Sequence, residues 1–98
     1  MSLPSGHYRI LDYREFHDLP RLMWVADEAS RQWLLDCPFD DVLDDYAAEY
    51  RVHTVGTDVE DAVEPWEEHA QGLLPMVGTV PVAALQFDAT HRASFLLT

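Results

Sequence analysis

The sequence predicts an α+β domain with a mostly antiparallel sheet of about five or six strands, which can curl into a small barrel, and two short helices. Several short segments are rich in β-branched and aromatic residues, hairpin-like pairs of them stand near both ends of the chain, and two other segments have helical spacing. The expected order is β-β-β-α-β-α-β-β, with too few helical crossovers for a doubly wound parallel sheet. The length of 98 residues fits one domain, residues 1–98.

The N-terminal third is expected to hold three strands. Residues 7–16 alternate in part between apolar and polar side chains, which indicates the first strand. Residues 21–26 and 31–37 flank a polar stretch and predict a hairpin, in which a symmetric loop pairs Trp24 with Trp33. Both faces of this hairpin are apolar. It therefore needs a cover on each side, by helices, by curvature of the sheet or by a second copy in a homodimer.

The next segment has the spacing of a short helix followed by a strand. Residues 40–47 carry apolar side chains at i, i+1, i+4 and i+5, which predicts that one face of a helix is apolar. These side chains are Val42, Leu43, Tyr46 and Ala47. Residues 48–55 are rich in β-branched and aromatic types and predict a strand.

The clearest helical pattern covers residues 58–71. Thr57 and Glu60 have the spacing of a capping box, and Gly72 stands where a helix commonly ends. Pro65 lies inside the pattern, where it removes a backbone hydrogen bond. The sequence therefore predicts either a kinked helix or two short helices, with Pro65 at the start of the second.

The C-terminal third predicts a second hairpin. Residues 79–87 and 92–97 flank a short polar loop, and Pro81 places the first of these strands at its start or at a sheet edge. Residues 70–87 carry no charge, but the prolines and glycines among them break a lipid-facing helix. We expect no membrane association.

The composition excludes several classes of protein. The chain has 18 acidic and 6 basic residues for a net charge of −12, which argues against binding to nucleic acid or to anionic membrane surfaces. A hydrophobic content of 48% argues against a disordered acidic tail. The single cysteine, Cys37, and the absence of a basic-then-apolar leader at the N-terminus favour a cytoplasmic location.

The negative charge is concentrated in the middle of the chain. Residues 36–68 hold twelve acidic residues and one arginine, a net charge of −11. If the fold gathers them on one surface, that surface steers a basic partner protein into place. We therefore interpret the chain as a non-catalytic interaction module that binds by charge attraction, as small acidic inhibitors of basic proteins do. The simpler explanation of the negative charge is that it keeps the protein soluble. The expected partner-binding residues are Asp41, Asp44, Asp45, Glu60, Asp61, Glu64, Glu67 and Glu68.

The alternative is a small metal-binding or enzymatic domain that uses Cys37, a histidine and the carboxylates of Asp40–Asp45. The carboxylates beside Cys37 disfavour a thiolate, and no EF-hand pattern or two-histidine spacing is present. Nucleotide-binding glycine motifs are also absent from the sequence. We accordingly expect no catalytic residue, no metal and no cofactor.

Overall fold

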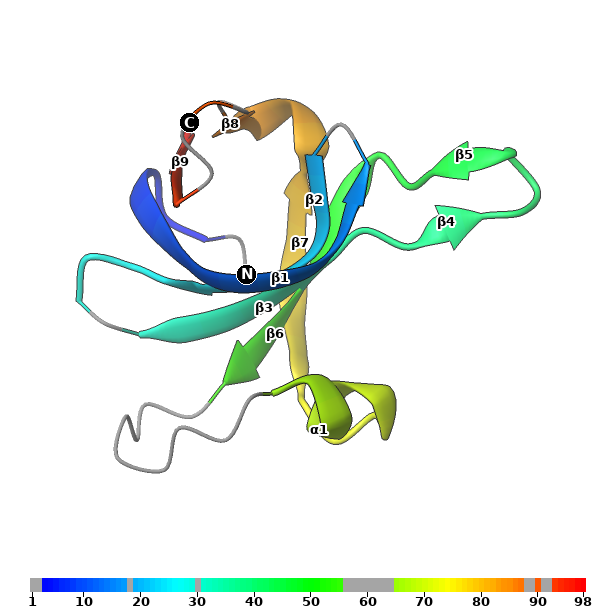
Figure 1. The fold of residues 1–98 in the computed structure, drawn as a ribbon, viewed down its shortest axis with the longest axis horizontal. Helices are drawn as coiled ribbons and strands as arrows, with labels where there is room; N and C mark the ends of the chain where they lie inside the picture. Colours follow the sequence, from blue (N-terminus) through cyan, green and yellow to red (C-terminus); the bar gives the residue numbers. More distant parts are fainter. Residues whose placement is uncertain (1–2, 18, 30, 56–64, 88–89, 91–92) are drawn as a thin grey trace.

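The fold is built on one seven-stranded antiparallel sheet that curls into half a barrel (Figure 1). The computed structural model describes residues 3–17, 19–29, 31–55, 65–87, 90 and 93–98. The strand order is β7-β6-β3-β2-β1-β9-β8, and a separate two-stranded sheet of β4 and β5 projects to one side. The strands are β1 Gly6–His17, β2 Leu19–Ala26, β3 Gln32–Asp36, β4 Phe39–Asp40, β5 Asp45–Tyr46, β6 Glu49–Val55, β7 Met76–Pro81, β8 Leu85–Phe87 and β9 Ser94–Leu97.

The predicted α+β class with two helices is wrong, because the protein is mostly β. Within the described ranges the only α-helix is α1, Trp66–Ala70, and one 3-10 turn, η2, covers Val82–Ala84. Pro65 directly precedes α1, as one of the two alternatives for this proline anticipates. The predicted cap at Thr57 and Glu60 lies outside the described residues.

The predicted helix over residues 40–47 is instead the β4–β5 hairpin. The Asp40 carboxylate accepts hydrogen bonds from the backbone N–H groups of Val42 (2.9 Å) and Leu43 (3.4 Å). It thereby offers these groups a partner in a turn rather than in a helix. Asp44 has φ +52°, in the left-handed region that an α-helix excludes.

The β2–β3 hairpin forms as predicted, but its register differs by one residue. Val25 pairs with Trp33, and Trp24 pairs with Leu34, so the predicted Trp24–Trp33 pair is wrong. The cause is a longer loop that begins at Asp27, whose side chain accepts hydrogen bonds from the N–H groups of Ala29 (2.9 Å) and Arg31 (2.8 Å). Arg31 is thus part of the loop rather than of the strand.

The core fills the concave side of the curled sheet. Tyr8 at the start of β1 stacks on Phe95 of β9 with ring centroids 5.2 Å apart and nearly parallel planes. Strands from both ends of the chain therefore supply this core. Its buried members are Leu3, Tyr8, Met23, Val25, Trp33, Leu35, Cys37, Tyr50, Val52, Val80, Leu85, Phe95 and Leu97.

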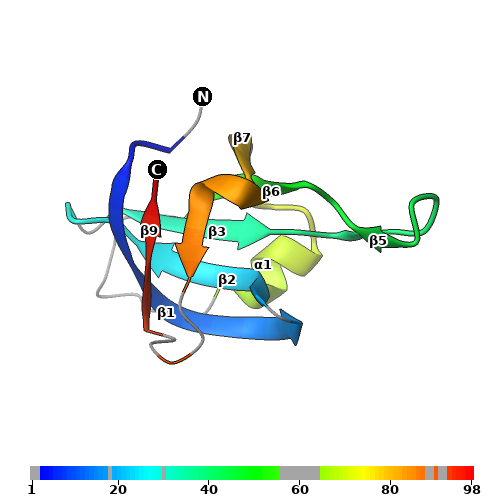
Figure 2. The same cartoon turned by 90° about the horizontal axis from the view of Figure 1, so that it is seen from above.

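Helix α1 lies over the opposite, outer face of β3 and β6 (Figure 2). Leu34 points to this face, because Trp33 and Leu35 on either side of it belong to the core, and it is 0% exposed. The His69 ring of α1 contacts Asp36 of β3 and His53 of β6, which are neighbours of Leu34 on the same face. Curvature of the sheet encloses one apolar face of the hairpin, and α1 lies over part of the other face. The homodimer stays a prediction that sedimentation velocity can test.

The predicted strand over residues 79–87 is divided. Pro81 ends the edge strand β7, and the chain then turns through η2 into β8 at the other edge of the sheet. A proline at this place is tolerated because an edge strand has one side without a neighbour in the ladder. No helix in the described part of the chain is long and apolar enough to cross a membrane.

Candidate functional site

The hairpin of β4 and β5 forms an arm, residues 38–47, that projects away from the curled sheet (Figures 1 and 2). Phe39 pairs with Tyr46, and their rings meet edge to face with centroids 5.4 Å apart. The backbone N–H of Ala47 donates to the carbonyl of Pro38 (2.9 Å) and closes the ladder at the base of the arm. A two-stranded hairpin is weak by itself, so this arm depends on contacts with the main sheet.

Arg21 and Cys37 provide those contacts at the base of the arm. The Arg21 guanidinium lies 4.2 Å from the centre of the Tyr46 ring, and its Nη1 donates to Cys37 Sγ at 3.6 Å. The Cys37 thiol lies 3.2 Å from the carbonyl oxygen of Ala47 and donates to it. Cys37 is fully buried and joins the two sides of the arm, a structural position for a thiol.

The tip of the arm, Val42 and Leu43, is apolar and exposed. Val42 is 93% exposed and Leu43 is 67% exposed, although the helical prediction places both against a core. Phe39, nearer the base, is 50% exposed. Sequence reasoning missed this feature, but its signal is readable: two adjacent apolar residues stand between Asp40-Asp41 and Asp44-Asp45. Flanking aspartates of this kind favour turns over helices.

The structure places the predicted partner-binding residues in two groups. Asp41, Asp44 and Asp45 are exposed on the arm. Glu67 and Glu68 are exposed in the first turn of α1. The arm projects from the sheet, whereas α1 lies against its outer face (Figure 1), so these two groups do not form the single acidic surface that the sequence suggests. The remaining predicted residues, Glu60, Asp61 and Glu64, lie outside the described residues.

Two histidines and an aspartate meet beneath α1. His69 Nε2 lies 3.3 Å from Asp36 Oδ2, and the His53 and His69 rings are 4.8 Å apart in an edge-on arrangement. His53 Nδ1 is 3.1 Å from the carbonyl oxygen of Leu74, so Nδ1 donates there. These contacts fasten α1 and the segment after it to the sheet. Nevertheless, no three histidine, cysteine or carboxylate side chains in the described ranges are placed to hold a metal ion.

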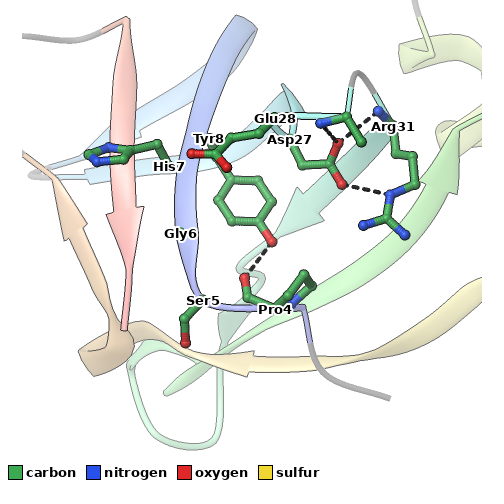
Figure 3. Close-up of a pocket in the computed structure, with 9 residues that line it drawn as sticks. Pro4, Ser5, Gly6, His7, Tyr8, Asp27, Glu28 and Arg31 are labelled. Atoms are coloured by element: carbon green, nitrogen blue, oxygen red, sulfur yellow. Dashed lines mark hydrogen bonds and ion pairs between the residues drawn. The ribbon is translucent and has the colours of Figure 1, made fainter.

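A cavity of about 250 Å³ lies between the start of β1 and the loop that joins β2 to β3 (Figure 3). Tyr8 lines it and donates its hydroxyl to the carbonyl of Pro4 (2.6 Å). Asp27 lines it on the other side, where Arg31 Nε donates to its carboxylate at 2.8 Å. Figure 3 shows His7 on the far side of the β1 ribbon from Tyr8.

Two titratable groups of this cavity, Asp27 and Tyr8, are engaged in structural contacts. Burial by itself raises the pKa of Asp27, but hydrogen bonds from the backbone and side chain of Arg31, its positive charge and the Ala29 N–H outweigh burial and hold the pKa below its ordinary value. Burial, together with the negative charge of Asp27, raises the pKa of Tyr8. The carboxylate therefore stays ionised and bonded, and the phenol stays protonated. Neither group is suited to be a general base. The contacts of Asp27 stabilise the loop between β2 and β3, and the contact of Tyr8 stabilises the start of β1.

Comparison with known proteins adds no relative, because no family model, curated protein or solved structure matches the chain.

Proposed function

We propose that this protein is a non-catalytic interaction module that docks onto a basic partner protein. The observation that carries the proposal is the arm, which holds Asp41, Asp44 and Asp45 exposed on a projection of a molecule with net charge −12. Exposed carboxylates on a projection can be approached by a cation from several sides, and the net charge of −12 adds a long-range attraction. Such a field steers association.

The ion pairs within the described residues support this assignment. Arg14 pairs with Asp12 and Arg31 pairs with Asp27, and the His69 ring contacts the Asp36 carboxylate. The carboxylates of these pairs lie outside the arm. Arg21, the arginine at the base of the arm, lies against the Tyr46 ring and the Cys37 thiol. Asp41, Asp44 and Asp45 are exposed on the arm, where cations of a partner can reach them.

Affinity capture tests the proposal. The purified protein is immobilised and exposed to an extract of the cells that naturally make it, at about 0.1 M and again at about 1 M salt, where the Debye length falls from about 10 Å to about 3 Å. We expect a captured protein that is rich in lysine and arginine and that is released at high salt. A captured set that is acidic or neutral, or that stays bound at high salt, contradicts the proposal.

Matched charge variants then locate the surface on the purified partner. Asp41→Asn with Asp44→Asn removes two charges from the arm, and asparagine tolerates the left-handed backbone of position 44. Glu15→Gln with Glu28→Gln removes two exposed charges elsewhere. We expect the arm variant to associate several-fold more slowly than the control variant at low salt. Equal association rates for the two variants would show that the arm is not the surface that steers association.

A further inference from the structure

We infer that the tip of the arm is an apolar anchor, whose Val42 and Leu43 side chains insert into a groove on the partner with lysine or arginine at its rim. This inference rests on the proposed function and adds to it the part of the surface that determines how long the complex lasts. Charge on the arm speeds association and remains part of the binding free energy, so high salt still releases the partner. The tip adds an apolar contact that slows dissociation.

The exposure of the tip is not explained by the fold. Single exposed apolar residues are ordinary on protein surfaces, but Val42, Leu43 and Phe39 are gathered on one short projection. Hairpin turns are usually made by polar residues or glycine. Here Asp40 bonds the turn and Asp44 supplies its left-handed residue, so the turn chemistry requires neither apolar side chain. Burial against another molecule would remove these apolar side chains from water, which is favourable.

The arm presents its tip in a fixed geometry. The Asp40 carboxylate holds the backbone of Val42 and Leu43, and the edge-to-face contact of Phe39 with Tyr46 ties the two strands together. Arg21 then holds Tyr46 against the main sheet. Because these contacts restrain the backbone of the tip, docking loses less conformational entropy than the ordering of an unrestrained loop does.

The charges around the tip identify the occupant. Asp41 and Asp44 are the residues on either side of Val42 and Leu43, and both are exposed. A groove that receives the tip therefore brings its rim against carboxylates, so lysine or arginine at that rim is complementary. A second copy of this chain brings another net charge of −12, and an anionic lipid surface is repelled in the same way. The fitting partner is a basic protein with a small apolar groove.

Photo-crosslinking to the purified basic partner tests where the tip lies. The photoreactive residue p-benzoylphenylalanine replaces Leu43 in one protein and Leu73, which is similarly exposed at 63%, in the control protein. We expect an adduct from position 43 that maps by mass spectrometry to apolar partner residues flanked by lysine or arginine, and none from position 73. The absence of an adduct at position 43, or equal adducts at both positions, overturns the inference.

Binding kinetics supply the second test. Val42→Ser with Leu43→Ser is compared with Leu73→Ser and Met76→Ser, which removes two exposed apolar side chains from another surface. We expect the tip variant to raise Kd by about ten- to hundred-fold, chiefly through faster dissociation, and to keep its salt dependence. The control should bind like the wild type. Circular dichroism confirms that both variants are folded.

The two hypotheses fail in different ways. If the arm charge variant associates slowly while the tip variant binds like the wild type, the proposed function stands and the anchor is refuted. If the extract yields no basic protein that salt releases, the proposed function has failed, and with it the inference that rests on it.

Discussion

Replacement of Leu34 by alanine tests whether α1 covers the outer face of the sheet. Leu34 is 0% exposed, and truncation of a fully buried leucine costs about 2–5 kcal/mol, depending on how far the surroundings collapse into the cavity. The cover here is a five-residue helix that is able to settle inward, so we expect about 2–3 kcal/mol, in the lower half of that range. A domain of this size has a free energy of unfolding of about 5–15 kcal/mol. The loss is therefore a large fraction of the total.

Equilibrium unfolding in urea, followed by circular dichroism, measures this loss. With a slope of about 1–3 kcal/mol per molar urea, a loss of about 2–3 kcal/mol should lower the midpoint by about 0.7–3 M. Leu43→Ala is the matched control: Leu43 is exposed at the tip of the arm, so its truncation should change stability by less than about 0.5 kcal/mol. An unchanged midpoint for Leu34→Ala would show that the outer face is open to water and would refute the covering role of α1.

Two further predictions concern buried titratable groups. Asp27→Asn should lower stability by about 1 kcal/mol at neutral pH, because the pair with Arg31 is lost while an amide oxygen still accepts the loop N–H groups. The pKa of Asp27 is lower in the folded chain than its ordinary value of 3.8. The stability that Asp27 contributes is therefore present above pH 3.8 and is lost as the pH falls below it. The urea midpoints of wild type and variant should accordingly converge in acid. Burial, and to a smaller extent Cys37, raises the pKa of Tyr50 to about 12. The contribution of Tyr50 to stability is therefore full below pH 10 and is lost as the pH rises towards 12. Tyr50→Phe should remove a phenol that ionises near 12 from the alkaline absorbance titration and cost about 1–2 kcal/mol, because the buried Pro20 carbonyl loses its donor.

The strands were the predictable part of this fold because their pattern is local. The β-branched and aromatic residues of 48–55 predict a strand, and β6 lies over Glu49–Val55. The register of β2 against β3 was not predictable from alternation, since it depends on how many residues the loop takes. The Asp27 side chain determines that number by bonding the N–H groups of Ala29 and Arg31. A pattern of apolar residues carries no information about such a bond.

The error at residues 40–47 has a related origin. The apolar spacing there fits a helix, but periodicity does not say whether a face is buried against its own protein. The segment holds four aspartates, and aspartate side chains favour turns because they accept hydrogen bonds from nearby backbone N–H groups. Asp40 makes such a bond to the Val42 N–H in the structure. The exposed carboxylates of Asp41, Asp44 and Asp45 were predicted from charge alone. The apolar tip between them was not, because its side chains had been assigned to a core.

The pairing of β1 with β9 has a consequence for folding. Gly6 lies opposite Leu97, and Phe95 supplies the ring on which Tyr8 stacks, so the first strand finds its neighbour about ninety residues further along the chain. A ribosome must therefore finish β9 before the concave core is complete. Until then β1 has an unpaired edge, which is the kind of surface that chaperones shield and that aggregation exploits. Completion of the concave core therefore waits for the synthesis of β9.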